Sequence, residues 1–261
     1  MQESNRGIIM VKHVEILNNN GKVMRGYLDY PDGAKELVIF YHGFTGNKSE
    51  HAYHFRNFAR ILSKNNIASL RLDFSGNGES DGEFKEFTMD TLMDDAKLIY
   101  EYAKKIKGIK YVDVLGFSMG GGVASMMSAI YGNEIHKLIL WSAAGTICEH
   151  IRIAFDKGVK LDNGNVLIGT YFELSKEMYD STFKYDPFKG IEVYTNPVLL
   201  VHGRNDQAVD YLTSMKYAVT YKNAITHIID ECGHGYDKVE QQKDLYDTSL
   251  NFLLEDYSIK D

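Results

Sequence analysis

The stretch that most constrains the fold of this chain is a serine bracketed by glycines near the middle of the sequence. The apolar run Tyr111–Leu115 leads directly into Gly116-Phe117-Ser118-Met119-Gly120, and a helix-like pattern, Val123–Met127, follows. A Gly-x-Ser-x-Gly string between a strand and a helix is typical of the nucleophile elbow, a strained turn that lifts the serine hydroxyl above a sheet edge. Glycine on each side avoids a clash with the neighbouring strand and helix. The pattern therefore predicts Ser118 as a nucleophile on an α/β sheet.

Short apolar runs separated by helix-length segments surround this turn. Nearly continuous hydrophobicity over about five residues is typical of strands covered on both faces, as in a parallel sheet. The N-terminal segments Val11–Leu17 and Lys22–Tyr30 instead flank the turn signal Asn18–Gly21, which predicts a hairpin. We therefore predict an α/β fold: a mostly parallel central sheet, an N-terminal antiparallel hairpin and helices on both faces. The predicted parallel strands are Leu37–Tyr41, Ile67–Leu72, Tyr111–Leu115, Lys137–Trp141, Val198–Val201 and Ile225–Ile229, and Leu92–Ile106 is a predicted helix.

One interval, residues 142–195, is much longer than a single crossover helix. It contains amphipathic pieces at Ile147–Phe155 and Tyr171–Tyr179 and a polar turn at Leu161–Asn165. The interval is neither rich in proline nor low in complexity, so it is not typical of a linker. We predict one catalytic core formed by residues 1–141 and 196–261, with residues 142–195 inserted as a cap.

A serine hydroxyl is a weak nucleophile until a base removes its proton, so Ser118 needs a histidine and a carboxylate. In the elbow arrangement these follow later in the chain, acid first and histidine second, each just past a later strand. Asp206 and His234 occupy these positions. Asp210 is the alternative acid, but its place before Tyr211-Leu212-Thr213 is typical of a helix N-cap. We predict Ser118 as nucleophile, His234 as general base and then acid, and Asp206 as the group that orients the imidazole.

The first predicted parallel strand ends in His42-Gly43-Phe44-Thr45-Gly46. Acyl transfer to a serine needs two backbone N–H donors aimed at the developing oxyanion. One comes from the residue after the nucleophile and the other from the loop after this strand. The sequence therefore predicts an oxyanion hole made by the amides of Phe44 and Met119, with an ordinary β-turn as the alternative interpretation of the loop.

Other patterns argue against metal or nucleotide chemistry. His42, His51 and His54 lie close in sequence, but no cysteines, histidines and carboxylates with metal-ligand spacing accompany them. The string Gly43–Ser49 lacks the glycine that a P-loop has before its lysine, and the glycines of Asp73–Gly82 do not match a dinucleotide fingerprint. We predict no cofactor and no metal.

Charge and hydropathy exclude other partners. The chain has 29 Lys and Arg against 36 Asp and Glu, a net charge of -7, which gives no general attraction for nucleic acid. The longest uncharged apolar stretches, such as Leu138–Gly145, are too short to span a membrane, and Glu3 and Arg6 interrupt the N-terminal segment where a signal peptide would be apolar. Cys148 and Cys232 are interpreted as free thiols, with a disulfide as the alternative. These features predict a cytoplasmic protein.

Taken together, these motifs resemble the α/β-hydrolase superfamily and, more narrowly, the bacterial cinnamoyl and feruloyl esterases. The resemblance extends from Phe40 to Tyr236 and implies a small cap after Trp141. Phe117 and Met119 depart from the histidine and glutamine usual in that group, and Asn77 stands where it usually has histidine, so the substrate preference stays open. The motifs that carry the resemblance are His42–Gly46, Arg71–Gly82, Gly116–Gly120, His202–Asp206 and Gly233-His234.

The sequence therefore predicts a serine carboxylesterase that cleaves small esters through an acyl-enzyme, with cinnamoyl and feruloyl esters implied by the resemblance. An acylglycerol lipase, an acyl thioesterase and an aminoacyl peptidase of the same fold are alternatives, and so is a binding protein without catalytic activity. The expected partner is a small-molecule ester, and a homodimer is left open. Tyr171 and Tyr179 are candidate substrate contacts in the cap, although tyrosines often serve in packing.

Overall fold

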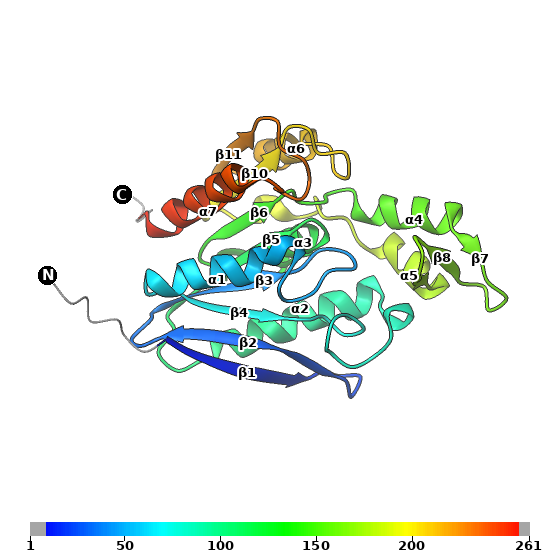
Figure 1. The fold of residues 1–261 in the computed structure, drawn as a ribbon, viewed down its shortest axis with the longest axis horizontal. Helices are drawn as coiled ribbons and strands as arrows, with labels where there is room; N and C mark the ends of the chain where they lie inside the picture. Colours follow the sequence, from blue (N-terminus) through cyan, green and yellow to red (C-terminus); the bar gives the residue numbers. More distant parts are fainter. Residues whose placement is uncertain (1–8, 256–261) are drawn as a thin grey trace, which may run out of the picture.

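The central sheet sets the architecture of residues 9–255, which the computed structural model describes (Figure 1). Its strands lie in the order β1-β2-β4-β3-β5-β6-β10-β11. The β1–β2 and β2–β4 pairs are antiparallel, and all the pairs from β4 onward are parallel. The predicted α/β fold with an N-terminal hairpin is therefore confirmed. The strands are β1 Ile9–Leu17, β2 Val23–Pro31, β3 Glu36–Tyr41, β4 Ala68–Leu72, β5 Tyr111–Phe117, β6 Leu138–Trp141, β10 Val198–Gly203 and β11 Ala224–Ile229.

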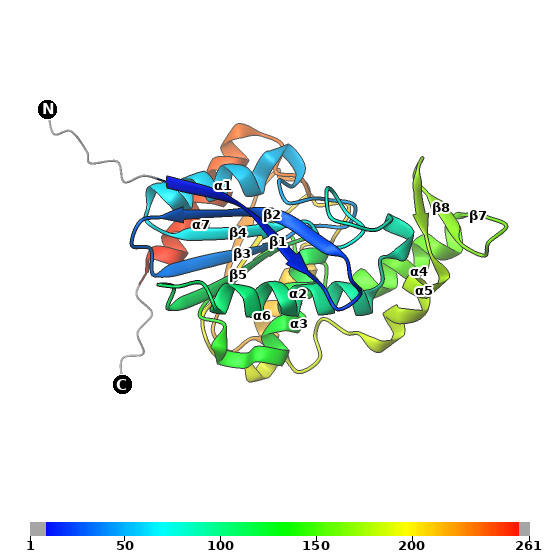
Figure 2. The ribbon, with the colours of Figure 1, turned by 90° about the horizontal axis from the view of Figure 1, so that it is seen from below.

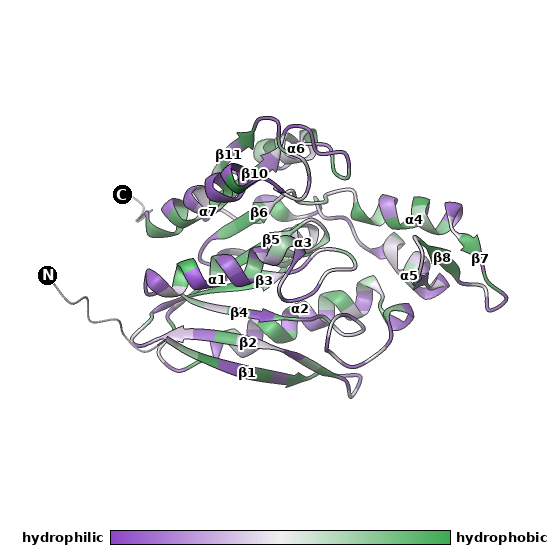
Figure 3. Ribbon diagram, in the orientation of Figure 1, coloured by the Kyte–Doolittle hydropathy of each residue, from purple (hydrophilic) through white to green (hydrophobic). Residues whose placement is uncertain are grey.

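Helices cover both faces of this sheet. Helices α1 and α7 lie on one face, and α2, α3 and α6 lie on the other, as Figure 2 shows. Figure 3 shows hydrophobic residues along the central strands and alternating hydrophilic and hydrophobic bands along α1. This is expected for strands that are covered on both faces and for a helix that is buried on one face. The helices are α1 His54–Lys64, α2 Met89–Lys104, α3 Met119–Tyr131, α6 Leu212–Thr220 and α7 Val239–Leu254.

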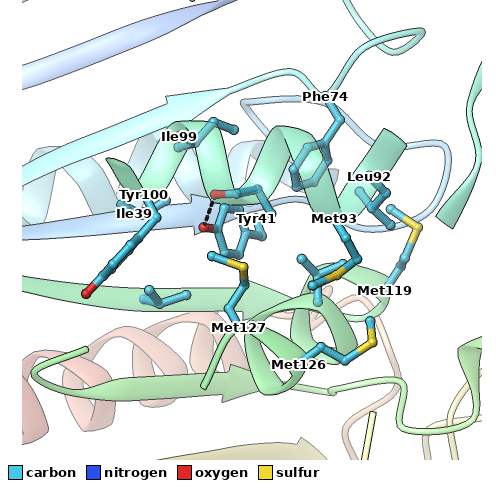
Figure 4. Close-up of a cluster of buried hydrophobic side chains, with 14 of the residues drawn as sticks. Ile39, Tyr41, Phe74, Leu92, Met93, Ile99, Tyr100, Met119, Met126 and Met127 are labelled. Carbon is cyan, nitrogen blue, oxygen red and sulfur yellow. Dashed lines mark hydrogen bonds between the residues drawn. The ribbon is translucent and has the colours of Figure 1, made fainter. Parts of the chain in front are cut away.

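The core between the sheet and the α2–α3 layer fixes the position of the predicted elbow. Met119 begins α3, and its side chain is fully buried beside Leu92 and Met93 (Figure 4). In the same cluster the Tyr41 hydroxyl, at the end of β3, donates a 2.8 Å hydrogen bond to the Ala96 carbonyl of α2. The strand ends and the start of α3 are thus held together by one packed interior.

The middle of residues 142–195 forms a separate small layer beside the sheet, at the right of Figure 1, and the 3₁₀ turn Ile191–Val193 returns to pack against α3. The predicted piece Tyr171–Tyr179 is not one element: it divides into a strand and a helix, because Ser175 caps the helix by accepting from the Met178 amide at 3.1 Å. The role of this segment as a cap stays a prediction. Its elements are α4 Ile147–Lys157, the three-stranded antiparallel sheet of β7 Val159–Lys160, β8 Val166–Ile168 and β9 Phe172–Leu174, and α5 Lys176–Ser181.

Within residues 9–255, no helix has both the length and the apolar character needed to cross a bilayer. Cys148 and Cys232 are both buried and unpaired.

Candidate active site

Ser118 lies in a strained turn between β5 and α3. Its φ of 53° and ψ of -118° fall in a backbone region that residues other than glycine rarely adopt. The flanking glycines are required by space: a Cβ on Gly116 would lie 2.1 Å from the Gly120 carbonyl oxygen, and a Cβ on Gly120 would lie 1.9 Å from that of Tyr41. The Ser118 amide donates to the Trp141 carbonyl of β6 at 2.9 Å. The turn thus projects the hydroxyl from the carboxyl edge of the sheet.

The structure brings Ser118, His234 and Asp206 into one hydrogen-bonded row. The Ser118 hydroxyl lies 3.0 Å from His234 Nε2, and His234 Nδ1 lies 2.6 Å from Asp206 Oδ2. The His234 side chain is 25% exposed and that of Asp206 is fully buried. The alternative acid, Asp210, does not reach this row, since its carboxylate accepts from the Leu212 amide at the start of α6.

Four donors surround the Asp206 carboxylate. Oδ1 accepts from the amides of Ala208 and Val209, each at 2.8 Å, and Oδ2 accepts from His234 and, at 3.1 Å, from His202 Nε2. Burial by itself would raise the pKa of Asp206, but hydrogen bonds from His202, His234 and the Val209 amide outweigh it and hold the pKa well below its usual range. The carboxylate beside His234 is therefore kept ionised.

His202, the histidine of β10, was not predicted from the sequence to have a role. Its Nε2 also lies 2.9 Å from the Val209 carbonyl, and two acceptors at one nitrogen require that this nitrogen carry the proton. Its Nδ1 pairs with the Ser214 hydroxyl at 2.7 Å. His202 is fully buried and ties the loop of Asp206 to α6. The only signal in the sequence was its position four residues before Asp206, at the end of a predicted strand.

The two predicted oxyanion donors lie on either side of Ser118. Within the described residues the amide nitrogens of Phe44 and Met119 make no hydrogen bond to the protein, and Met119 is the first residue of α3. Such amides are available to a developing negative charge. The loop of Phe44 is held by Glu50, which sequence reasoning missed: its carboxylate accepts from the Gly43 amide at 2.7 Å.

The three histidines considered as metal ligands are used separately. His42 accepts from the Phe74 amide through Nε2, His51 pairs with Asp237, and His54 lies 2.7 Å from the Gly235 carbonyl. A different trio, Glu36, Asp113 and His136 at the opposite sheet edge, has its ligand atoms within 4.8 Å of one another. The Lys137 ammonium lies 3.8 Å from the Glu36 carboxylate. A resident cation at that trio would meet this positive charge, so we do not assign a metal there.

A pocket of about 570 Å³ opens over Ser118. Residues 43–47, 50 and 51 line it together with residues 117, 118, 234, 235 and 237. None of the described residues 142–195 is among them. Tyr171 and Tyr179, the candidate substrate contacts in the cap, do not line this pocket, which lies between the Phe44 loop and the segment after His234.

Comparison with known proteins identifies the family and several relatives of this chain. The model of the family described as serine aminopeptidase, S33, matches residues 32–170, more than half of the chain. The chain belongs to this family. As a member, it is an α/β-fold hydrolase.

A solved structure of Est1E from Butyrivibrio proteoclasticus with ferulic acid bound is 28% identical, with a TM-score of 0.83 over 92% of this chain and 98% of that one. The 2-hydroxy-6-oxo-6-(2'-aminophenyl)hexa-2,4-dienoic acid hydrolase of Metapseudomonas resinovorans is 24% identical to this family member, over 92% of this chain and 91% of that protein. The predicted resemblance to bacterial feruloyl esterases is confirmed.

Proposed function

We propose that this hydrolase is a serine carboxylesterase that cleaves small esters through an acyl-enzyme. The observation that carries the proposal is the row Ser118–His234–Asp206, with hydrogen bonds of 3.0 and 2.6 Å, next to two unpaired backbone amides. A nucleophile, its base and the group that orients the base are thus in place together.

In the proposed reaction His234 Nε2 removes the proton from the Ser118 hydroxyl as its oxygen attacks the ester carbonyl carbon. The oxyanion accepts from the amides of Phe44 and Met119. The C–O bond of the alcohol then breaks, and His234 gives the proton to the leaving oxygen. Water, deprotonated by the same imidazole, attacks the acyl carbon. The bond from that carbon to Ser118 Oγ then breaks, His234 returns the proton to Oγ, and the acid is released. Asp206, kept ionised by its four donors, stabilises the imidazolium that forms twice in this cycle.

Aromatic acyl groups are the proposed substrate class. The ring of Phe44 lies 5.5 Å from Phe84, which in turn lies 4.9 Å from Phe172 of β9, and Tyr171 continues the row. These contacts are edge-to-face or tilted, and Phe44 is the member of the row that lines the pocket over Ser118. Aromatic side chains of this kind favour a planar ring beside them. The structure with ferulic acid bound to the related Est1E supports the same class, so feruloyl and other cinnamoyl esters are the proposed substrates.

Two measurements test the proposal. Ser118→Ala is expected to abolish hydrolysis of a short-chain nitrophenyl ester and covalent labelling by a fluorophosphonate, because both need the serine oxygen. Values of kcat/KM for feruloyl, acylglycerol, acyl-CoA and aminoacyl peptide substrates then rank the classes, with feruloyl esters expected first. Full activity in Ser118→Ala would refute the mechanism, and a higher kcat/KM on peptides would favour the aminopeptidase activity for which the family is described.

A further inference from the structure

The part of the pocket lining that adjoins His234 is a polar surface without an assigned role. Asp237 lies three residues after His234, and its Oδ1 is 2.7 Å from His51 Nε2. The side chains of His51 and Asp237 are 54% and 71% exposed. We call His51, Glu50 and Asp237 the acidic rim, and all three line the pocket over Ser118.

Buried hydrogen bonds fix the acidic rim in place. His54 is buried, lies 2.7 Å from the Gly235 carbonyl and pairs with the Tyr246 hydroxyl of α7 at 2.6 Å. On the other side the backbone of Glu50 has a φ of 60°, and its carboxylate accepts from the amides of Gly43 and His51. A strained backbone held by surrounding contacts is typical of preformed binding sites. The rim is therefore preorganised and is not a loose surface loop.

The proposed reaction decides which part of the substrate faces the rim. His234 Nε2 must hand its proton to the departing oxygen or sulfur, so the leaving group has to lie against His234. Residues 235 and 237 continue from it around the pocket. This step rests on the proposed function.

The charge of the rim is negative. Among the described lining residues, Glu50 and Asp237 are carboxylates and none is lysine or arginine. A single positive charge on His51 would not balance two carboxylates. A cleft lined by one sign of charge raises the local concentration of opposite charges and lowers that of like charges.

We propose that the acidic rim is a leaving-group subsite that accepts neutral and cationic alcohols or thiols and rejects anionic ones. In the step concerned, Ser118 Oγ bonds to the acyl carbon, the bond from that carbon to the leaving oxygen or sulfur breaks, and the leaving atom takes the proton from His234. An acyl-CoA, whose leaving group carries several negative charges on its phosphates, is therefore expected to be a poor substrate for this site.

Three thioesters of one acyl group test the effect of the leaving group's charge. Thiocholine carries a cationic leaving group, pantetheine a neutral one, and coenzyme A presents the pantetheine arm with added phosphates. At low ionic strength kcat/KM is expected to be about tenfold lower for the coenzyme A thioester than for the other two, and the gap is expected to narrow in high salt.

Variants of Asp237 assign the effect to the rim. Asp237→Asn is expected to lower, by about threefold, the ratio of kcat/KM for the thiocholine ester to kcat/KM for the coenzyme A ester. Asp237→Glu keeps the negative charge and is expected to leave this ratio unchanged. Asp230→Asn is the control, because Asp230 is an exposed aspartate paired with Arg204 outside the pocket.

Equal kcat/KM values for the three thioesters would overturn the proposed subsite, and so would a ratio of thiocholine to coenzyme A kcat/KM that Asp237→Asn leaves unchanged. In either case, hydrolysis that still depends on Ser118 would uphold the proposed function. Absence of all hydrolysis and of fluorophosphonate labelling would overturn both.

Discussion

The two edges of the central sheet each bury an aspartate, and they treat it in opposite ways. At the carboxyl edge Asp206 receives four hydrogen bonds, and its pKa is held well below its usual range. At the opposite edge Asp113 is equally buried, but within the described residues its Oδ2 has no hydrogen-bond partner. Burial raises the pKa of Asp113 to about 7. Hydrogen-bond donors around a buried carboxyl can therefore outweigh the effect of burial on its pKa.

At the opposite edge two carboxyls, those of Glu36 and Asp113, lie close together. Glu36 Oε1 also has no hydrogen-bond partner within the described residues, and burial together with the nearby Asp113 raises the pKa of Glu36 to about 8. One proton held between the two carboxyls would satisfy both oxygens. That arrangement suits a buried structural cluster, whereas the proposed chemistry at Ser118 requires a permanent negative charge beside His234.

The largest expected effect comes from removing the charge at the carboxyl edge. Asp206→Asn is expected to lower kcat on a nitrophenyl ester by roughly a thousandfold or more, because the imidazolium loses its partner and the imidazole its orientation. Asp113→Asn, the same change at the other edge, is expected to leave kcat within about twofold. Similar losses in the two variants, at matched folding by circular dichroism, would contradict the division of roles between the edges.

The next effect tests whether the donors around Asp206 matter. His202→Phe removes one donor and is expected to lower kcat by about ten- to a hundredfold with little change in KM, because Asp206 is then less firmly placed. His202→Gln supplies an amide N–H and is expected to restore part of the rate. If both variants lost rate equally, or only KM changed, His202 would have a structural role alone. His136→Gln serves as the control at the opposite edge.

The pH dependence of stability should show the opposite signs of the two edges. Because the folded-state pKa values of Glu36 and Asp113 lie above their unfolded values, the folded chain binds more protons between about pH 4 and pH 8, and stability falls as pH rises through that window.

Asp113→Asn should flatten this fall, by roughly 2 kcal/mol in the free energy of unfolding at pH 8 relative to pH 5. Asp206 acts with the reverse sign, since its lowered pKa gives stability that is present above about pH 4 and lost on acidification. Urea denaturation at a series of pH values measures both, and a wild-type stability that fell no further between pH 5 and pH 8 than that of Asp113→Asn would refute the shared proton.

The smallest effect concerns the aromatic row at the carboxyl edge. Phe84→Ala is expected to lower kcat/KM for a feruloyl ester relative to an acetyl ester by about three- to tenfold, the worth of one aromatic contact. Tyr111→Ala, which removes a ring lying 4.6 Å from the His136 ring at the other edge, should leave that ratio unchanged. An unchanged ratio in Phe84→Ala would remove the aromatic row from the proposed acyl site.

Much of the carboxyl edge could be predicted from the sequence because its chemistry follows chain order. A strand, a turn and a helix place Ser118, and the two later strands place Asp206 and His234 at the same edge, which is where the structure has them. His202 could not be found in this way, because its role depends on Ser214 and Asp206, which it meets only in space.

The pocket position was also beyond the sequence. The length of residues 142–195 indicated an insertion, but where its small sheet projects depends on packing between α4, α5 and the 3₁₀ turn Phe84–Glu86. The acidic rim was likewise not predicted, because His51 and Asp237 are far apart in the chain and neither belongs to a motif.

The burial of the Met119 side chain has a thermal consequence. The Met119 side chain is packed beside Leu92 and Met93, while its backbone amide directly follows Ser118, so the amide cannot move without disturbing the interior. Heating should therefore not inactivate the enzyme at this position while the fold survives: the temperature at which turnover is lost should coincide with the temperature at which the α2–α3 layer melts.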